Sequence, residues 1–129
     1  MGGTAVKPQI LMVDDDAQLL RSLERVLRRD AARWDITFAL GGAAAVLRLR
    51  EQVFDVVVSD FDMGSMMGSD VFAVAAESSP AALRIMLTAR EGLVPWQVSA
   101  HLILTKPCSI DVLRGLIELR ISQRDAGSR

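Results

Sequence analysis

Five short apolar segments, each followed by a longer stretch with the spacing of a helix, constrain the fold of this chain most strongly. The segments have the length of β-strands and occupy residues 10–13, 35–40, 54–59, 83–88 and 102–105. The third contains Val56-Val57-Val58, a β-branched apolar run that is typical of a strand buried on both faces. Strands that alternate with helices pair in parallel through helical crossovers. We therefore predict an α/β fold, a doubly wound five-stranded parallel sheet.

The stretches between these segments carry the signals of helices. Leucine and valine recur at helical spacing after Asp16, whose side chain suits the N-cap of the first helix. Strong helix formers predict the next two helices at residues 43–51 and 69–77. Residues 95–100 form at most a short helix that begins with proline. Ser109 precedes a last helix that we expect to end at about Gln123.

Composition excludes several classes of protein. The 129 residues fit one domain, which we expect over 1–129, with a core at about 7–121 and a tail or the start of a linker at 122–129. The 15 basic and 16 acidic residues nearly balance, which argues against direct nucleic-acid binding and against a polybasic membrane surface. A single cysteine excludes an internal disulfide, and no apolar run approaches the roughly 18 residues of a membrane span. We therefore expect a cytoplasmic domain without membrane contact.

Polar residues follow four of the predicted strands at the point where each strand ends: Asp14-Asp15-Asp16, Asp60 with Asp62, Thr88, and Lys106-Pro107. In an open parallel sheet the carboxyl ends of the strands meet at one edge, where ligands bind. Clustered carboxylates repel one another, and a hard divalent cation such as Mg²⁺ (or Mn²⁺) relieves that repulsion. With a metal present, one carboxylate can attack a phosphoryl group while the ammonium and the hydroxyl stabilise its oxygens.

Four of these segments together resemble the receiver domain of two-component response regulators. They are Ile10–Asp15, the loop Asp60-Phe61-Asp62-Met63-Gly64-Ser65-Met66-Met67-Gly68, Leu87-Thr88-Ala89, and Leu104-Thr105-Lys106-Pro107. Each motif is weak alone, but the four occur in the family's order, each after its own strand. The resemblance covers residues 7–121 approximately and implies a flavodoxin-like (βα)5 fold with strand order 2-1-3-4-5.

The resemblance also implies roles for individual residues. Asp60 is the expected phosphoacceptor, which takes a phosphoryl group from a histidine kinase or a phosphotransfer protein. Asp14 and Asp15, with Asp60 and the backbone carbonyl of Asp62, are expected to hold Mg²⁺. Thr88 is expected to hydrogen-bond the phosphoryl group and Lys106 to pair with it, after a cis peptide bond to proline. Such a domain is not an enzyme in the usual sense, because it catalyses only its own phosphorylation and dephosphorylation.

The chain departs from the family pattern in four places. Gly64 replaces the usual proline, which predicts a looser loop. The stretch between Thr88 and Lys106 is short by about one helical turn, which trims the fourth helix. Ile103 stands at the switch position that usually holds an aromatic residue. Asp62 and Arg90 occupy variable positions, with Ala89 between Thr88 and Arg90, and we expect these modulating residues to interact and tune the lifetime of the phosphoryl group.

Two other functions fit parts of the sequence. The set of carboxylates, threonine and lysine also resembles that of haloacid-dehalogenase-type phosphohydrolases, but their nucleophile follows the first strand and Asp60 follows the third. A receiver that no longer switches and acts only by docking is the second alternative. The last helix carries an unusually wide apolar arc, with Val112, Leu116 and Leu119 beyond its core stripe. This arc predicts either a deeply packed helix or a surface, beside the fifth strand, for a homodimer or an output domain.

Overall fold

The computed structural model describes residues 6–127. Its strands are β1 (Gln9–Asp14), β2 (Asp35–Leu40), β3 (Val56–Asp60), β4 (Leu83–Thr88) and β5 (Leu102–Thr105). Its helices are α1 (Ala17–Leu27), α2 (Gly42–Glu51), α3 (Gly68–Ser78) and α4 (Ile110–Gly127), with two short 3-10 helices, η1 (Arg28–Asp30) and η2 (Pro95–Val98).

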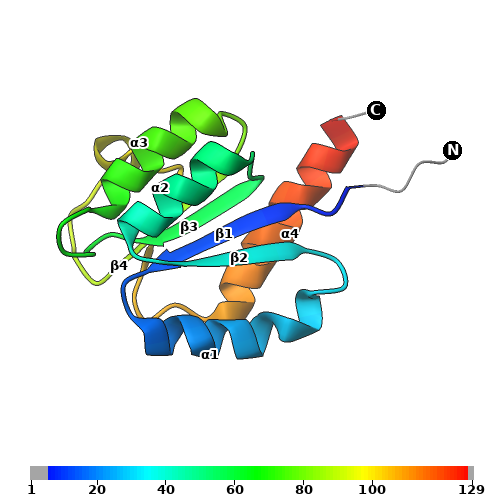
Figure 1. Cartoon of the computed structure of the whole chain (residues 1–129), viewed down its shortest axis with the longest axis horizontal. Helices are drawn as coiled ribbons and strands as arrows, with labels where there is room; N and C mark the ends of the chain where they lie inside the picture. The colour runs from blue at the N-terminus through cyan, green and yellow to red at the C-terminus, as the bar shows by residue number, and fades with distance from the viewer. Residues whose placement is uncertain (1–5, 128–129) are drawn as a thin grey trace, which may run out of the picture.

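The five strands form one parallel sheet in the order β2-β1-β3-β4-β5, which confirms the predicted fold. Helices α2 and α3 cover one face of the sheet and α1 and α4 cover the other, as Figure 1 shows. The carboxyl ends of the strands point to the left in Figure 1. The predicted site residues therefore lie on one side of the molecule.

The two halves of the core follow from the alternation of side chains along each strand. Leu11 and Val57 pack with α2 and α3, whereas Ile10 and Val58 pack with α1 and α4. All residues of β3 are buried, as expected for the central strand of a sheet that is covered on both faces. The core thus holds β1 and β3 rigidly, and these are the strands that end in Asp14 and Asp60.

The short fourth helix that begins with proline is confirmed: it is the 3-10 helix η2, which ends at Ser99 in a left-handed conformation with φ of 58°. Two local details differ from the sequence prediction. The last helix continues past Gln123 to Gly127, because Arg124 donates a hydrogen bond of 3.1 Å to Asp55 and so anchors the added turn. Strand β3 begins at Val56 rather than at residue 54, since the Phe54 amide bonds the Ser79 hydroxyl instead of a neighbouring strand.

His101 joins the start of β5 to β4 and makes this contact sensitive to pH. Its amide donates to the carbonyl of Arg84 at 2.9 Å, and its Nδ1 accepts a hydrogen bond from the amide of Arg84 at 2.9 Å. A protonated imidazole cannot accept at Nδ1. Burial lowers the pKa of His101 below its usual 6.5, and the charges of Arg84 and Arg120 lower it further.

We expect the stability of the fold to decrease as the pH falls below about 6.5, because the unfolded chain protonates His101 before the folded chain does. This loss ends once the pH is below the lowered pKa of the folded state. His101→Asn retains an acceptor near the Nδ1 position and cannot titrate. Urea unfolding between neutral and mildly acidic pH should therefore show a steeper loss of stability for the native chain than for His101→Asn. Parallel curves for the two proteins would contradict this expectation.

Candidate functional site

Three carboxylates gather where β1 and β3 end. Oxygen atoms of Asp14, Asp15 and Asp60 lie within 4.8 Å of one another. Asp14 and Asp60 are only 4% and 8% exposed, whereas Asp15 is open to solvent. Burial raises the pKa of Asp14 above its usual value, and the charges of Asp60 and Asp15 add to this, against the opposing effects of the Asp16 amide and Lys106. The negative charges of the three carboxylates therefore repel one another, and a cation can relieve this repulsion.

Lys106 is the cation that the fold itself places at the cluster. Its Nζ lies 2.9 Å from Oδ1 of Asp60 and 3.7 Å from Oδ2 of Asp14. Burial alone would lower the pKa of Lys106, but the hydrogen bond and the charge of Asp60, with the charge of Asp14, raise it above its usual value. The Lys106–Pro107 peptide bond is cis, as predicted. Lys106 therefore stays charged and holds one oxygen of Asp60.

Thr88 lies beside the cluster because β4 is the neighbour of β3. Leu87 pairs with Asp60 in the sheet register, and Thr88, the next residue, is buried at the end of β4. The Thr88 hydroxyl accepts a hydrogen bond of 3.0 Å from the amide of Arg90. A hydroxyl that accepts one bond keeps its own proton to donate. Ala89, the next residue, is exposed.

The loop between β3 and α3 is shaped by two glycines. Gly68 starts α3 against the main chain of Asp60: a Cβ at this position would lie 2.3 Å from the Asp60 carbonyl oxygen. Gly64 has φ of 77°, in the left-handed region that proline cannot adopt. The replacement of the usual proline thus allows a turn with a positive φ at this position. The sequence predicts only that the loop is looser.

A second contact, between Met66 of this loop and Gly42 at the start of α2, escaped the sequence prediction. A Cβ on Gly42 would meet the Met66 side chain at 2.7 Å. The sequence marked Gly41-Gly42 only as a break in the chain, and no local signal connects that pair to a methionine in another loop. The contact joins the β3–α3 loop to the β2–α2 junction.

Asp62 and Arg90 form the ion pair that their charges predict. The guanidinium donates to both oxygens of Asp62, from Nε at 3.1 Å and from Nη2 at 2.9 Å. It also lies over the ring of Phe61, with 5.2 Å between Cζ and the ring centroid.

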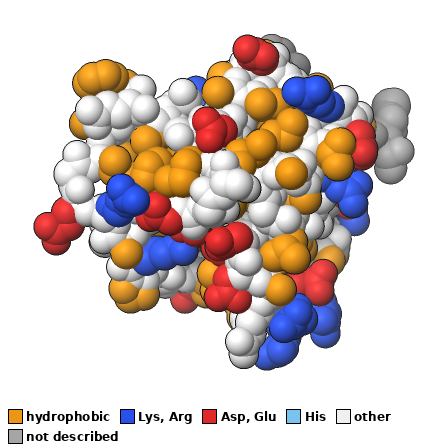
Figure 2. Space-filling model, turned by 60° about the vertical axis from the view of Figure 1, so that its left-hand side comes forward, with side chains coloured by type: hydrophobic (Ala, Val, Ile, Leu, Met, Phe, Trp, Pro, Cys, Tyr) orange, Lys and Arg blue, Asp and Glu red, His pale blue; other side chains and the backbone are white. Residues whose placement is uncertain are grey.

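Ile103, at the predicted switch position, is half-buried and packs with the α2–α3 half of the core. Figure 2 turns the carboxyl-end side of the sheet forward and shows acidic side chains next to basic ones there.

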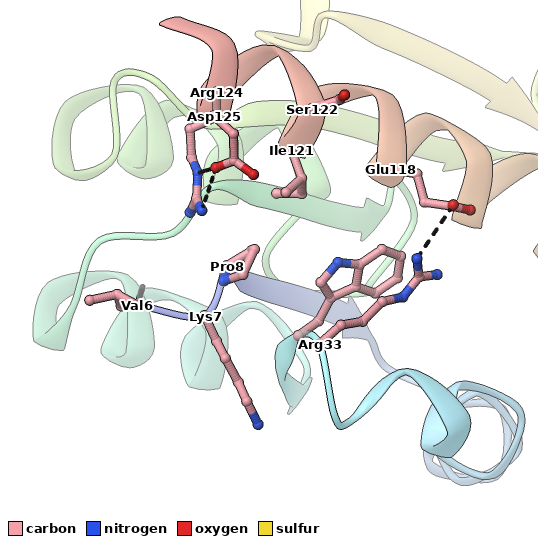
Figure 3. Close-up of a pocket in the computed structure, with 10 residues that line it drawn as sticks. Val6, Lys7, Pro8, Arg33, Glu118, Ile121, Ser122, Arg124 and Asp125 are labelled. Atoms are coloured by element: carbon pink, nitrogen blue, oxygen red, sulfur yellow. Dashed lines mark hydrogen bonds and ion pairs between the residues drawn. The ribbon is translucent and has the colours of Figure 1, made fainter. Parts of the chain in front are cut away.

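A hollow of about 520 Å³ lies away from these residues, beside the C-terminal half of α4. It is lined by the segment before β1, by Arg33 and Trp34, and by α4, as Figure 3 shows. Two ion pairs lie within it: Arg33 with Glu118 at 3.4 Å, and Arg124 with Asp125 at 2.9 Å. Among the residues that the structure describes, the cluster of carboxylates lies at the Asp14–Asp60 edge and not in this hollow.

The donor set at that edge fits a hard divalent cation. All three side chains offer carboxylate oxygens, which Mg²⁺ prefers, and the exposed position of Asp15 leaves room for water or phosphate oxygens. Neither sulfur nor imidazole belongs to the cluster, so a soft or nitrogen-preferring metal has no matching ligand there.

The family model of the response regulator receiver domain matches residues 10–118. The chain belongs to this family. Receiver domains generally bind Mg²⁺ in an acidic pocket, and this chain has a cluster of three aspartates, Asp14, Asp15 and Asp60. The match favours the receiver interpretation over a phosphohydrolase of haloacid-dehalogenase type.

Curated relatives agree with this assignment. The receiver domain is 34% identical over 119 residues to the transcriptional regulatory protein GlrR of Escherichia coli, a match that covers 88% of this chain and 26% of GlrR. It is 30% identical over 122 residues to the probable transcriptional regulatory protein TcrX of Mycobacterium tuberculosis, over 92% of this chain and 50% of TcrX. The chain thus spans between about a quarter and a half of the length of these relatives.

Solved structures confirm the fold. A CheY-like receiver domain protein from Methanospirillum hungatei superimposes with a TM-score of 0.80 over 94% of this chain and 99% of that chain, at 21% identity. Within residues 6–127, no helix has both the length and the hydropathy that a membrane span requires.

Proposed function

We propose that Asp60 accepts a phosphoryl group from a phosphohistidine of a histidine kinase or phosphotransfer protein. The observation that carries this proposal is the Asp60 carboxylate, held by Lys106 at 2.9 Å and flanked by Asp14 and Asp15. A free oxygen of Asp60 attacks phosphorus, the phosphorus–nitrogen bond breaks, and the imidazole keeps the electron pair. Hydrolysis later returns the carboxylate and releases inorganic phosphate. We propose that the chain catalyses only these two reactions.

Each neighbouring residue has a distinct part in this proposal. Lys106 balances the charge that accumulates on the phosphoryl oxygens, and the Thr88 hydroxyl donates its proton to one of them. Asp14, Asp15 and Asp60, together with the backbone carbonyl of Asp62, would hold Mg²⁺ or Mn²⁺, and the ion would supply positive charge near the phosphoryl oxygens.

The first test is the intact mass after incubation with acetyl phosphate and Mg²⁺. We expect one phosphoryl adduct on the native chain, none with Asp60→Asn, and none after metal removal by a chelator. If no adduct accumulates, binding of beryllofluoride distinguishes rapid hydrolysis from an inactive pocket. Failure of beryllofluoride to bind would favour a receiver that acts only by docking, and turnover of phosphomonoesters would favour a phosphohydrolase.

We propose that the Asp62–Arg90 pair sets the lifetime of the phosphoryl group. With Asp62→Ala, Arg90 is free to stabilise the phosphoryl charge and hydrolysis should slow; with Arg90→Ala it should accelerate. A change of about fivefold corresponds to about 1 kcal/mol, the upper range for an exposed ion pair. The decay of the adduct by mass spectrometry measures both rates. Identical decay in the native chain and both variants would contradict this role.

An apolar groove beside Lys106 supports a protein phosphodonor. Its volume is about 410 Å³, and its lining comprises Leu19, Leu23, Leu87, Pro107, Cys108, Ile110 and Leu113, with Lys106 at the same groove. A small-molecule donor needs no such surface, whereas a helix that presents a phosphohistidine can place an apolar side chain there.

The outer surface of α4 supports a further partner. Val112 and Leu119 are exposed, and Leu116 is half-buried, so the wide apolar arc is only partly packed. We propose that an output domain or a second copy of the chain covers this face beside β5 in the cytoplasm. The mass of the phosphorylated chain in solution tests the second copy: a dimer supports it and a monomer contradicts it.

A further inference from the structure

We infer that Arg90 transmits phosphorylation of Asp60 to the segment between β4 and β5 by exchanging its ion pair with Asp62 for one with the phosphoryl group. This inference rests on the proposed function of Asp60. Arg90 thereby links the carboxylate of Asp60 to the segment that contains Gly92, Val94 and η2.

The guanidinium of Arg90 already lies along the phosphoacceptor loop. It donates to Asp62 from Nε and Nη2 and covers the ring of Phe61, the residue between Asp60 and Asp62. The amide of Phe61 donates to the carbonyl of Leu87 at 3.0 Å, so this loop and the end of β4 are held together. The arginine therefore needs only a side-chain movement to turn from Asp62 toward a group on Asp60.

The energies favour such an exchange. The side chains of Asp62 and Arg90 are 49% and 59% exposed, and an exposed ion pair contributes at most about 1 kcal/mol. A phosphoryl group brings a charge of about −2 and three acceptor oxygens. It therefore competes for the same guanidinium with more charge than a single carboxylate has. Phosphorylation therefore shifts the protein from conformations in which Arg90 pairs with Asp62 to conformations in which Arg90 pairs with the phosphoryl group.

The backbone of Arg90 connects this exchange to the loop. Its amide donates to the Thr88 hydroxyl at 3.0 Å, the hydroxyl that we propose turns toward the phosphoryl group. Gly92 follows with φ of 81°, and the exposed segment ends at η2, where Trp96 is 78% exposed. A movement of Arg90 thus acts on a segment that has little packing before Val98.

Ile103 cannot connect Asp60 to the β4–β5 segment through a hydrogen bond. Its side chain has no hydrogen-bonding atom and packs into the α2–α3 half of the core. Within the described part of the chain, the hydrogen bonds that connect the loop after Thr88 to the loop after Asp60 through a side chain are those from Arg90 to Asp62. The positive charge of Arg90 thus takes the place that the family gives to an aromatic ring.

Nuclear magnetic resonance of the ¹⁵N-labelled chain tests this inference, with Mg²⁺ and beryllofluoride as the probe. The native chain should show shifts of the Asp60 amide, of the amides from Glu91 to Val94 and from Trp96 to Val98, and of the Trp96 indole. The buried Trp34 indole serves as an internal reference. In Arg90→Gln, at a concentration that saturates the Asp60 shift, the shifts from Glu91 to Val98 should be less than half of the native ones.

Two further variants sharpen the test. In Asp62→Asn the weakened pair should move the loop resonances of the probe-free protein part of the way toward their positions in the native complex. Arg25→Gln makes the same charge change on the exposed surface of α1 and should respond like the native chain. Loop shifts of native size in Arg90→Gln overturn the inference even when Asp60 binds the probe. Absence of any Asp60 shift in the native chain, with no acetyl phosphate adduct, overturns the proposed function instead.

Discussion

Gly68→Ala is expected to destabilise the fold by about 3 kcal/mol and to suppress phosphorylation of Asp60. The added Cβ would lie 2.3 Å from the Asp60 carbonyl oxygen and 3.1 Å from the Cα of Phe61. Both neighbours are main-chain atoms of a buried strand end, so neither can move as a flexible side chain does. Overpacking of this kind costs about 1–3 kcal/mol, with the larger values where the backbone must shift. A shift of the backbone here displaces the phosphoacceptor itself.

Gly115→Ala is the matched control, because a Cβ at this position of α4 meets nothing within 4 Å. Glycine inside a helix is less favourable than alanine by about 1 kcal/mol, so this variant should be slightly more stable than the native chain. Thermal unfolding should show a decrease of Tm on the order of 10 °C for Gly68→Ala and no decrease for Gly115→Ala. Gly68→Ala should also form less phosphoryl adduct with acetyl phosphate than Gly115→Ala does. Equal melting temperatures for the two variants would show that the loop absorbs the Cβ without strain.

The position of the acidic cluster could be predicted because it depends on topology. Parallel strands bring their carboxyl ends to one edge, so Asp14, Asp60 and Thr88 had to lie together once β1, β3 and β4 were recognised. The N-cap of α1 was equally accessible, because Asp16 bonds the amides of Gln18 and Leu19 within its own turn. Local and topological features of this kind need no knowledge of side-chain packing.

Other features were not predictable because they join residues that are distant in the sequence. The position of Gly64 suggested a loose loop, but no local pattern in the sequence specifies the positive φ that this residue adopts. The bond between Arg124 and Asp55 lengthens α4 beyond its predicted end. Asp30 and Arg114 look like surface residues in the sequence, yet they are only 2% and 5% exposed and bond each other across the fold. A pattern of charges does not show which of them will be buried in pairs.

The buried pair of Asp30 and Arg114 connects η1, which follows α1, to α4. Arg114 Nε donates to Asp30 at 3.1 Å, and its Nη1 donates to Asp111 at 2.9 Å. Arg33 is a second, half-exposed partner of Asp30 at 2.7 Å. Burial alone would raise the pKa of Asp30, but the hydrogen bonds and charges of Arg33 and Arg114 hold it below its usual 3.8. The carboxylate is therefore fully charged at neutral pH, and its contribution is lost only when the pH falls through the lowered value.

Arg114→Leu is expected to cost about 3–5 kcal/mol in the free energy of unfolding at neutral pH, because it leaves a buried charge with one half-exposed partner. Arg33→Met also removes one partner of Asp30, but Arg114 remains as a buried counter-charge, so its cost should be smaller. Urea unfolding of the three proteins measures this order. A larger loss of stability for Arg33→Met would mean that Arg33, rather than Arg114, contributes most to stabilising the Asp30 carboxylate.

The double variant Asp30→Ala with Arg114→Leu separates the charge from the packing. If the cost of Arg114→Leu comes from the unpaired carboxylate, removal of that carboxylate should restore at least part of the lost stability, because replacing both members of a buried ion pair is often close to neutral. If the cost comes from lost packing between α1 and α4, the double variant should be less stable than either single one. The coupling energy from this double-mutant cycle decides between the two causes. We expect restoration, since Asp30 and Arg114 lie almost entirely out of solvent and at 3.1 Å from each other.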